Sequence, residues 1–251
     1  MAKVSFIGAG PGDPELITVK GVNRIKQAGL ILYAGSLVPE EVITGYSGLP
    51  EDRIINTAGL NLEQTHDLMV EAVGKGEDVA RVHTGDPSLY GAIDEQILLL
   101  ENEGIECEVI PGISSAFAAA AALKTQLTVP GSSQTVIFTR LGARTPVPES
   151  EDLEKLAAHG STIIVFLSGQ LVREVVERLL AHYPADTPAA VVYRVGWPDQ
   201  KLFRAELEKV PELMKQEGIT RQVLIMVGPG MARKDSRSKL YDKDFSHGYR
   251  H

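Results

Sequence analysis

The sequence predicts an α/β protein of two domains, with a mostly parallel sheet and helices in the N-terminal domain and a mixed sheet in the C-terminal domain. Up to about residue 123, short hydrophobic segments alternate with segments of helical periodicity, which is typical of a parallel sheet with right-handed crossovers. After that residue, predicted strands follow one another with fewer helices between them. We therefore expect domains at residues 1–122 and 123–231, followed by a polar tail at residues 232–251.

Composition narrows the class of protein. The 251 residues carry a formal net charge of −8, which argues against a nucleic-acid binder. Cys107 is the only cysteine, so an internal disulfide is impossible and a reducing cytoplasm is expected. The chain runs from its first residues into a short strand rather than a signal peptide, and its alanine-rich run at residues 116–123 is too short to span a bilayer.

The N-terminal half shows regular alternation of strands and helices. Apolar runs predict strands at Val4–Ile7, Leu30–Tyr33, Arg53–Asn56, Asp78–His83 and Glu106–Ile110. Asp13 and Pro14 are good first residues for a helix, and apolar residues at helical spacing extend it as far as Gly29. Further helices are expected from Asn61, where Gln64 completes a capping box, over Ile93–Leu100, and after Pro111–Ser115.

The C-terminal half is richer in strands. They are expected at Gln134–Thr139, Thr162–Leu167, Ala189–Val195, Lys201–Arg204 and Gln222–Val227. Trp197–Gln200 is interpreted as a tight connection between two of them, which predicts some antiparallel pairing.

Two loops rich in glycine, proline and aspartate each follow a predicted strand. They are Gly8–Pro14 and Thr84–Gly91. Glycine lets a ligand approach the main chain, and proline holds a turn in one shape. We expect the two loops to form two backbone-lined edges of one ligand cleft.

Other chemistries find less support. The opening loop does not match a dinucleotide fingerprint, because Asp13 stands where the third glycine belongs and Pro11 interrupts the turn. The histidines show no metal-binding pattern on a helix, so no metal is expected. Ser114 and Ser115 lack a nucleophile elbow and are interpreted as helix-capping residues, whose hydroxyls and amides can also hold a polar ligand edge.

Taken together, these motifs resemble the tetrapyrrole methyltransferase family. The resemblance extends to about Pro229 and is carried by Val4–Leu16, Thr84–Gly91, Pro111–Ser115, Phe166–Gly169 and Val191–Gln200. Within the family, Tyr33–Val38 resembles the branch that methylates carbon 11 of precorrin-4, since the uroporphyrinogen branch typically has an aspartate where Ala34 stands.

The resemblance implies a two-domain tetrapyrrole-methylase fold, a homodimer, and S-adenosyl-L-methionine bound in the trough between domains and released as S-adenosyl-L-homocysteine. Carried over by motif, the cofactor-binding residues are Pro11, Thr84, Gly85, Asp86, Leu89, Ser115, Ala116, Leu167, Val195 and Pro229. Asp86 and Thr84 are also the catalytic candidates, either orienting the donor or helping a proton to leave. Leu167 replaces a methionine that is common in the uroporphyrinogen enzymes.

The implied substrate is an anionic tetrapyrrole, whose acetate and propionate groups need positive partners. Because arginine binds carboxylates through two parallel hydrogen bonds, the hypothesised anchors are Arg81, Arg140, Arg144 and Arg194. The alternatives are a methyltransferase acting at another precorrin position or on uroporphyrinogen III, a nucleotide-dependent oxidoreductase, and a ligand-binding protein without activity. Cobalt-containing and metal-free substrates are not distinguished.

Overall fold

Two compact units make up the chain in a computed structural model that describes residues 2–35, 37–142, 145–232 and 245–246. The first unit comprises the described residues up to Ala118 together with Arg194–Asp199, and the second comprises the rest. Of the expected polar tail, residues 233–244 and 247–251 lie outside the described residues. No helix in the described part of the chain is long and apolar enough to cross a membrane.

The first unit is built on a five-stranded parallel sheet with the strand order β3-β2-β4-β1-β5. Its strands are β1 (Lys3–Gly8), β2 (Leu30–Tyr33), β3 (Ile54–Asn56), β4 (Val79–His83) and β5 (Glu106–Ile110). The predicted parallel sheet is thereby confirmed. Because β1 lies between β4 and β5, the loops that follow these three strands leave the same edge of the sheet side by side.

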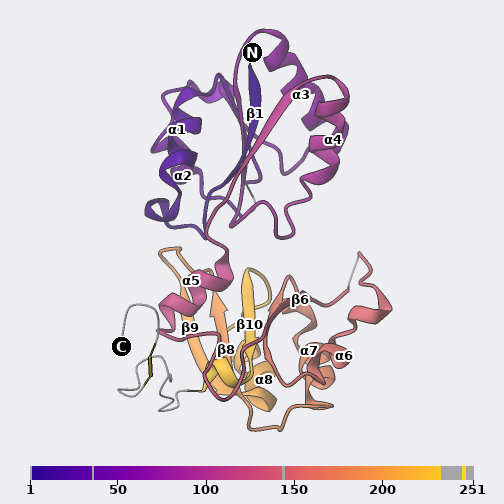
Figure 1. Ribbon diagram of the computed structural model, residues 1–251. Coiled ribbons are helices and arrows are strands. Elements are labelled where there is room, and N and C mark those ends of the chain that lie inside the picture. Colours follow the sequence, from indigo (N-terminus) through magenta and orange to yellow (C-terminus); the bar gives the residue numbers. More distant parts are fainter. Residues whose placement is uncertain (1, 36, 143–144, 233–244, 247–251) are drawn as a thin grey trace. The chain divides into compact units, whose positions relative to one another are not determined.

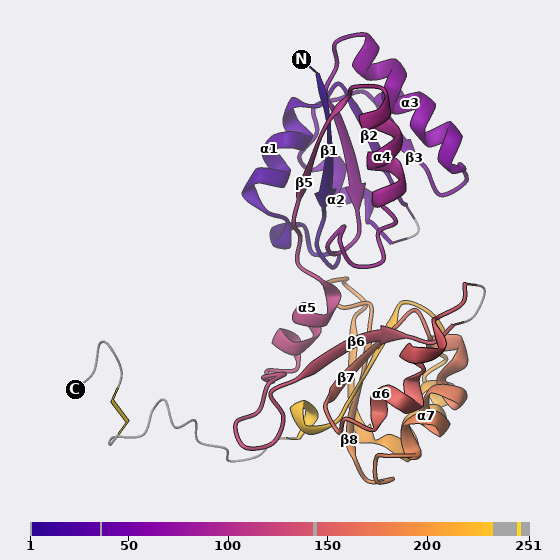
Figure 2. The same cartoon turned by 45° about the vertical axis from the view of Figure 1, so that its right-hand side comes forward.

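Helices cover both faces of this sheet (Figures 1 and 2). They are α1 (Val19–Gln27), α2 (Glu40–Thr44), α3 (Leu62–Gly74) and α4 (Asp94–Asn102). A further helix, α5 (Ser115–Ala122), follows β5 and contains the boundary between the two units. Ile25 of α1 and Val42 of α2 pack with Ile7 on one face. Met69 of α3 and Leu100 of α4 pack with Phe6 on the other. Neighbouring residues of β1 therefore enter opposite cores, as strand geometry requires.

The expected helix between Asp13 and Gly29 is wrong in its first part. Asp13 begins only a 3-10 turn, Pro14–Leu16, in which its carboxylate accepts a hydrogen bond from the Glu15 amide. Ile17 is extended, and Thr18 then begins α1 by accepting from the Gly21 amide at 3.1 Å. The chain thus has two capping residues in this segment. Asp13 caps only the 3-10 turn, and Thr18 sets the start of α1. The capping box at Asn61 and Gln64 is confirmed.

The second unit contains a mixed five-stranded sheet in the order β6-β7-β10-β8-β9, as expected. Its strands are β6 (Val136–Arg140), β7 (Thr162–Phe166), β8 (Pro188–Tyr193), β9 (Lys201–Glu206) and β10 (Val223–Val227). In the described part of this sheet, β6 and β7 pair in parallel, β10 pairs antiparallel with β7 and β8, and β8 and β9 form the antiparallel pair predicted around Trp197–Gln200.

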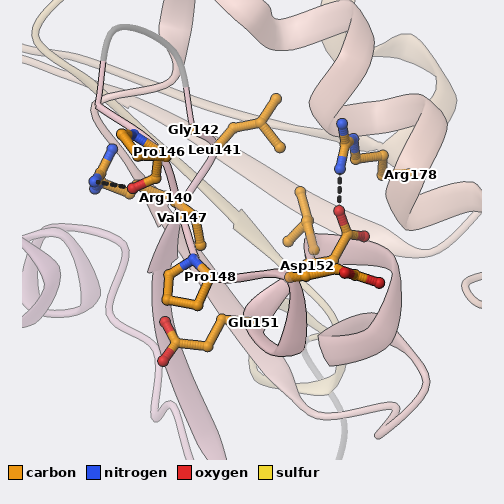
Figure 3. A pocket seen from close by; sticks show the side chains of 11 residues that line it. Arg140, Leu141, Gly142, Pro146, Val147, Pro148, Glu151, Asp152 and Arg178 are labelled. Atoms are coloured by element: carbon orange, nitrogen blue, oxygen red, sulfur yellow. Dashed lines mark hydrogen bonds and ion pairs between the residues drawn. The ribbon is translucent and has the colours of Figure 1, made fainter.

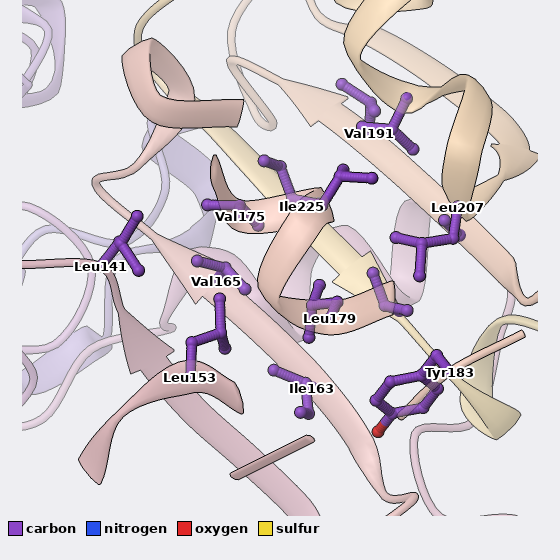
Figure 4. Close-up of a cluster of buried hydrophobic side chains, with 14 of the residues drawn as sticks. Leu141, Leu153, Ile163, Val165, Val175, Leu179, Tyr183, Val191, Leu207 and Ile225 are labelled. Carbon is purple, nitrogen blue, oxygen red and sulfur yellow. The ribbon is translucent and has the colours of Figure 1, made fainter. Parts of the chain in front are cut away.

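Three helices, α6 (Leu153–Ala157), α7 (Val172–Leu180) and α8 (Val210–Gln216), pack on one face of this sheet. Figure 4 shows side chains of α7 against those of the strands, with Val175 and Leu179 near Val165 and Ile225. These side chains are at most 1 % exposed, and each contributes about 1.5–3 kcal/mol of transfer free energy relative to an exposed position.

A cluster of charges ties β5 to β1 and α1. The carboxylate of Glu108 lies 2.9 Å from Lys3 Nζ and 3.0 Å from Lys20 Nζ, and it also accepts hydrogen bonds from Arg24 and Ser5. Partial burial alone would raise the pKa of Glu108, but the hydrogen bonds from Arg24, Lys3, Lys20 and Ser5 hold it far below its ordinary value. A carboxyl whose pKa is lowered by folding stabilises the folded state above its unfolded pKa, and this contribution is lost as the pH falls.

We therefore expect Glu108→Gln to lower the free energy of unfolding at pH 7 by about 2 kcal/mol. The difference from wild type should shrink as the pH falls below about 4.3, where the unfolded carboxyl binds a proton. Urea unfolding of both proteins between pH 7 and pH 4 measures it. The control is Glu106→Gln on the same strand. Because the Glu106 carboxyl is exposed, this substitution should lower the free energy of unfolding by less than about 0.5 kcal/mol. Equal costs for the two variants at pH 7 would contradict the network.

Candidate functional site

Three loops meet at the carboxyl edge of the first sheet. They follow the adjacent strands β4, β1 and β5 and comprise Thr84–Gly91, Gly8–Pro14 and Pro111–Ser115. Ligands of open α/β sheets bind outside the carboxyl ends of the strands. The loops singled out from the sequence therefore lie at the edge where such a ligand is expected.

The first two loops pair through their main chains. The Gly85 amide donates to the Gly10 carbonyl at 2.7 Å, and the Gly10 amide donates to the Gly85 carbonyl at 3.2 Å. Just before this pair, the Ala9 amide donates to the carbonyl of His83 at 2.8 Å. The structure thus brings the two glycine-containing loops together, as their residue types suggested.

Three glycines form the contact between all three loops. A Cβ on Gly112 would lie 2.1 Å from the Gly85 carbonyl oxygen, and one on Gly8 would lie 2.6 Å from Gly112 Cα. Gly85 differs from these two glycines. Its φ of +61° is left-handed, but a Cβ added to it would have space, because the nearest atom would be Ser114 Cα at 3.7 Å. Gly8 and Gly112 therefore serve packing within the protein, whereas the space beside Gly85 admits further atoms.

Asp86 links the second loop to the third. Its Oδ2 accepts from the Gly112 amide at 2.9 Å, and its Oδ1 accepts from the amide and hydroxyl of Ser88. Burial alone would raise the pKa of Asp86, but these hydrogen bonds together lower it. A carboxylate held ionised in this way is a weak proton acceptor. The catalytic role of Asp86 and of the half-buried Thr84 beside it stays a prediction.

The start of α5 lies at the third loop. The buried Ser114 accepts the Ala116 amide on its hydroxyl at 3.3 Å and the Phe117 amide on its carbonyl at 3.0 Å, which confirms the capping interpretation for Ser114, whereas Ser115 is the first residue of α5. Ser115 is half-buried and Ala116 is fully buried. Leu89, on the second loop, is half-buried and its amide donates to the Asp86 carbonyl at 3.2 Å.

The connection after β8 returns to the first loop. A Cβ on Gly12 would meet the Trp197 indole at 2.5 Å, and one on Gly196 would meet Pro11 Cγ at 3.1 Å. The Arg194 guanidinium lies 4.1 Å from the centre of the Trp197 ring and 3.0 Å from the Asp199 carboxylate. The sequence analysis did not predict this packing of Trp197, and the only signal for it in the sequence is the glycine at position 12.

Pro11 and Val195 are thus both buried in the first unit. Arg194 has its charge engaged by Asp199, and its part in substrate binding stays a prediction.

Arg81 and His83 are buried neighbours on β4. Arg81 is 8 % exposed and donates to Gln96 and Thr57, and burial lowers its pKa to about 10. His83 is 6 % exposed, its Nε2 has no hydrogen-bond partner among the residues that the structure describes, and its ring lies 5.9 Å from that of Phe6. Burial, and then the charge of Arg81, lowers the pKa of His83 to about 3, so the imidazole is neutral at pH 7. The proposed anchoring of substrate by Arg81 is untested.

The remaining site predictions fall in the second unit. Leu167 is 66 % exposed and has φ of +53°, an outlier for a non-glycine residue of the kind that gathers at functional sites. Ser168 holds this turn by donating to the Phe166 carbonyl and accepting from the Leu141 amide. Pro229 begins a 3-10 turn after β10. Their contact with a cofactor stays a prediction.

Arg140 borders a pocket of about 470 Å³ in the second unit (Figure 3). Its guanidinium donates to the carbonyls of Thr145 and Pro146, so it holds the loop after β6. Across the pocket, Arg178 pairs with Asp152, and acidic side chains balance the arginines of the lining. Arg144 lies outside the described residues, and the anchoring roles of both Arg140 and Arg144 remain predictions. Among the described residues, no group of three or more His, Cys, Asp or Glu is placed to hold a metal ion.

Comparison with known proteins identifies the family. The model of the tetrapyrrole (corrin/porphyrin) methylases matches residues 3–211. The chain belongs to this family. The sequence of this methylase is 51 % identical to that of a cobalt-precorrin-4 C(11)-methyltransferase of Methanocaldococcus jannaschii, over 99 % of this chain and 96 % of that protein. It is 47 % identical to a precorrin-4 C(11)-methyltransferase of Pseudomonas aeruginosa, over 98 % of each.

Solved structures confirm the fold of this methylase. A cobalt-precorrin-4 methyltransferase described as a cobalamin biosynthetic enzyme superposes with a TM-score of 0.88 at 45 % identity, covering 92 % of this chain and 96 % of the other. A uroporphyrin-III C-methyltransferase of Thermus thermophilus in complex with S-adenosylhomocysteine gives 0.71 at 26 % identity, covering 90 % and 92 %.

The glycine contacts predict unequal costs of adding one methyl group. Gly112→Ala should lower the free energy of unfolding by more than about 3 kcal/mol, because the Cβ meets a carbonyl oxygen that cannot move alone. Gly85→Ala has room and should cost only about 1–2 kcal/mol for its left-handed backbone. Urea unfolding compares the two, and a Gly112→Ala as stable as Gly85→Ala would show that the loops do not meet as described.

His83 predicts an acid-sensitive stability. Since folding lowers its pKa from 6.5 to about 3, its neutral form favours folding above pH 6.5, and the folded state is destabilised as the pH falls below that value. His83→Phe should remove this contribution, up to about 1.4 kcal/mol per pH unit. Stability of both proteins at pH 7.5, 6 and 5 measures it, with His159→Phe at an exposed position as control. Parallel pH profiles for His83→Phe and wild type would rule out a buried neutral imidazole.

Proposed function

We propose that this methylase transfers a methyl group from S-adenosyl-L-methionine to carbon 11 of precorrin-4, or of its cobalt-containing counterpart, in cobalamin biosynthesis. The carrying observation is identity of 47–51 % over 98–99 % of the chain to relatives named for this reaction. The loops that meet at the carboxyl edge of the first sheet belong to the stretch that the family model matches.

The residues at this edge fit an S-adenosyl nucleoside. Gly85 presents its main chain without a side chain and with room beside it, so a ligand can approach the backbone closely. The half-buried Leu89 offers apolar surface for an adenine, the buried Ala116 packs behind the start of α5, and the polar main chain at Ser114 and Ser115 begins that helix. We assign donor binding to these residues together with Pro11, Thr84, Asp86, Leu167, Val195 and Pro229.

The donor supplies a methyl group already activated by a sulfonium, so the protein has to position it and exclude water rather than generate a nucleophile. The residues of the three loops suit that task. Asp86 holds two loops together, Gly8 and Gly112 bring backbones into contact, and Pro11 packs against Gly196. Arginines at positions 140, 144 and 194 remain the candidates for the carboxylates of the tetrapyrrole.

Assembly and location complete the proposal. We propose a cytoplasmic homodimer built from domains at residues 1–122 and 123–231. The single cysteine, Cys107, is free and half-buried, which suits a reducing compartment.

The position of methylation is tested by turnover. Incubation with precorrin-4, or with its cobalt-containing counterpart, and donor carrying a ¹³C methyl group should give a product whose labelled methyl is assigned to carbon 11 by NMR. A label at another carbon, or turnover of uroporphyrinogen III instead, identifies a sister methyltransferase. Binding of S-adenosylhomocysteine without turnover of these substrates indicates a binding protein, and binding of NADH in its place indicates an oxidoreductase.

Donor binding is tested at Gly85. Gly85→Val places a branched side chain in the space beside the backbone and at a φ of +61°, so affinity for S-adenosylhomocysteine should fall by at least about 100-fold. Isothermal titration calorimetry measures it, and Gly131→Val, at another left-handed glycine with open space, controls for backbone strain. Wild-type affinity in a folded Gly85→Val protein removes this residue from the donor site.

A further inference from the structure

A chain of buried hydrogen bonds runs across the first unit beneath the loop Thr84–Ala92. Thr57 Oγ1 donates to the Tyr33 carbonyl at 3.1 Å and accepts from Arg81 Nη1 at 3.0 Å. Arg81 Nε donates to Gln96 Oε1 at 3.1 Å, and Gln96 Nε2 donates to the Ala92 carbonyl at 2.8 Å. Thr57, Arg81 and Gln96 are each at most 8 % exposed.

The chain ends on a strained segment. Tyr90 and Ala92 have φ of +60° and +48°, although neither is glycine. Gly91 lies between them with its Cα so close to the Pro87 carbonyl oxygen that a Cβ would be 2.1 Å from it. Such backbone conformations cost free energy and persist only where surrounding contacts hold them.

Hydrogen bonds to Arg81 and to Ala92 fix how the Gln96 amide is oriented. Arginine has donors and no acceptor, so the amide oxygen of Gln96 must face Arg81 and its NH₂ group must face Ala92. The Ala92 carbonyl, which can only accept, requires the same orientation, so the two hydrogen bonds hold the Gln96 amide from both ends. Arg81 therefore acts on the loop through Gln96.

We propose that Arg81 and Gln96 are positioning residues that hold the loop Thr84–Ala92 in its donor-binding shape, instead of Arg81 binding substrate carboxylates. The assignment rests on the proposed function, because it takes this loop as a wall of the donor site. The buried guanidinium is committed to two neutral acceptors, and β4 carries it beneath the loop rather than in it.

Gln96→Glu separates positioning from folding. A carboxylate still accepts from Arg81, with a stronger charged hydrogen bond, but it cannot donate to the Ala92 carbonyl. Gln96→Leu, which loses both hydrogen bonds, is the second variant. The control is Thr65→Val on α3, which loses a single buried hydrogen bond to the Asn61 carbonyl away from the loop.

Hydrogen exchange of the unliganded protein gives the first measurement. Amides of residues 88–93 should exchange at least about tenfold faster in both Gln96 variants and at the wild-type rate in Thr65→Val. Unchanged exchange in both Gln96 variants overturns the proposal. This measurement needs no ligand, so it decides the hold on the loop whatever the reaction is.

Calorimetric titration with S-adenosylhomocysteine gives the second. Affinity should fall about tenfold in Gln96→Glu, which is about 1.4 kcal/mol, and stay within about twofold in Thr65→Val. Faster loop exchange with wild-type affinity overturns the link between this loop and the donor. No affinity in the wild-type protein refutes the proposed function instead, and the exchange rates still decide whether Gln96 holds the loop.

Discussion

Contact between main chains at Gly8, Gly85 and Gly112 is the constraint on which the candidate site depends. These residues end or follow three neighbouring parallel strands, and their backbones approach so closely that neither Gly8 nor Gly112 could carry a Cβ. The contact fixes where the loops after β1, β4 and β5 begin, and the Gly10–Gly85 pair and the Asp86–Gly112 hydrogen bond extend it. The positions of the donor-binding residues proposed on these three loops follow from that arrangement.

Polar groups around this contact serve architecture more than reactivity. Asp86 joins two loops, Arg194 pairs with Asp199, and Arg81 is committed to Gln96 and Thr57. Methyl transfer from a sulfonium places its chief demand on orientation, so a site whose charged side chains fix loop geometry suits that reaction. A sequence shows residue type but not hydrogen-bond partners, so these contacts could not be predicted from it. The catalytic role of Asp86 and the substrate-binding role of Arg194 stay predictions.

The parallel sheet and both glycine loops were predictable because hydrophobic period, glycine and proline act locally. The bounds of β2 and β5 agree with the apolar runs at Leu30–Tyr33 and Glu106–Ile110. The helix after Asp13 was not predictable in full, since Asp13 and Thr18 are both capping residues and each caps its own element, a 3-10 turn and α1. The approach of Trp197 to Gly12 joins residues far apart in the chain, and no local pattern encodes it.

Residues with a strained backbone conformation also occur in loops that follow strands. Of the described non-glycine residues with positive φ, Tyr90, Ala92, Leu167 and Arg194 lie in loops that follow β4, β7 and β8, whereas Lys124 follows α5 and Gln222 precedes β10. A hydrogen bond or ion pair braces each of these loops, through Gln96 at Ala92, Ser168 beside Leu167, and Asp199 at Arg194. Loops without a function to serve are expected to relax such conformations, because relaxation gains free energy. Their retention beside side chains that brace them indicates that the fold maintains the path of these strand-end loops.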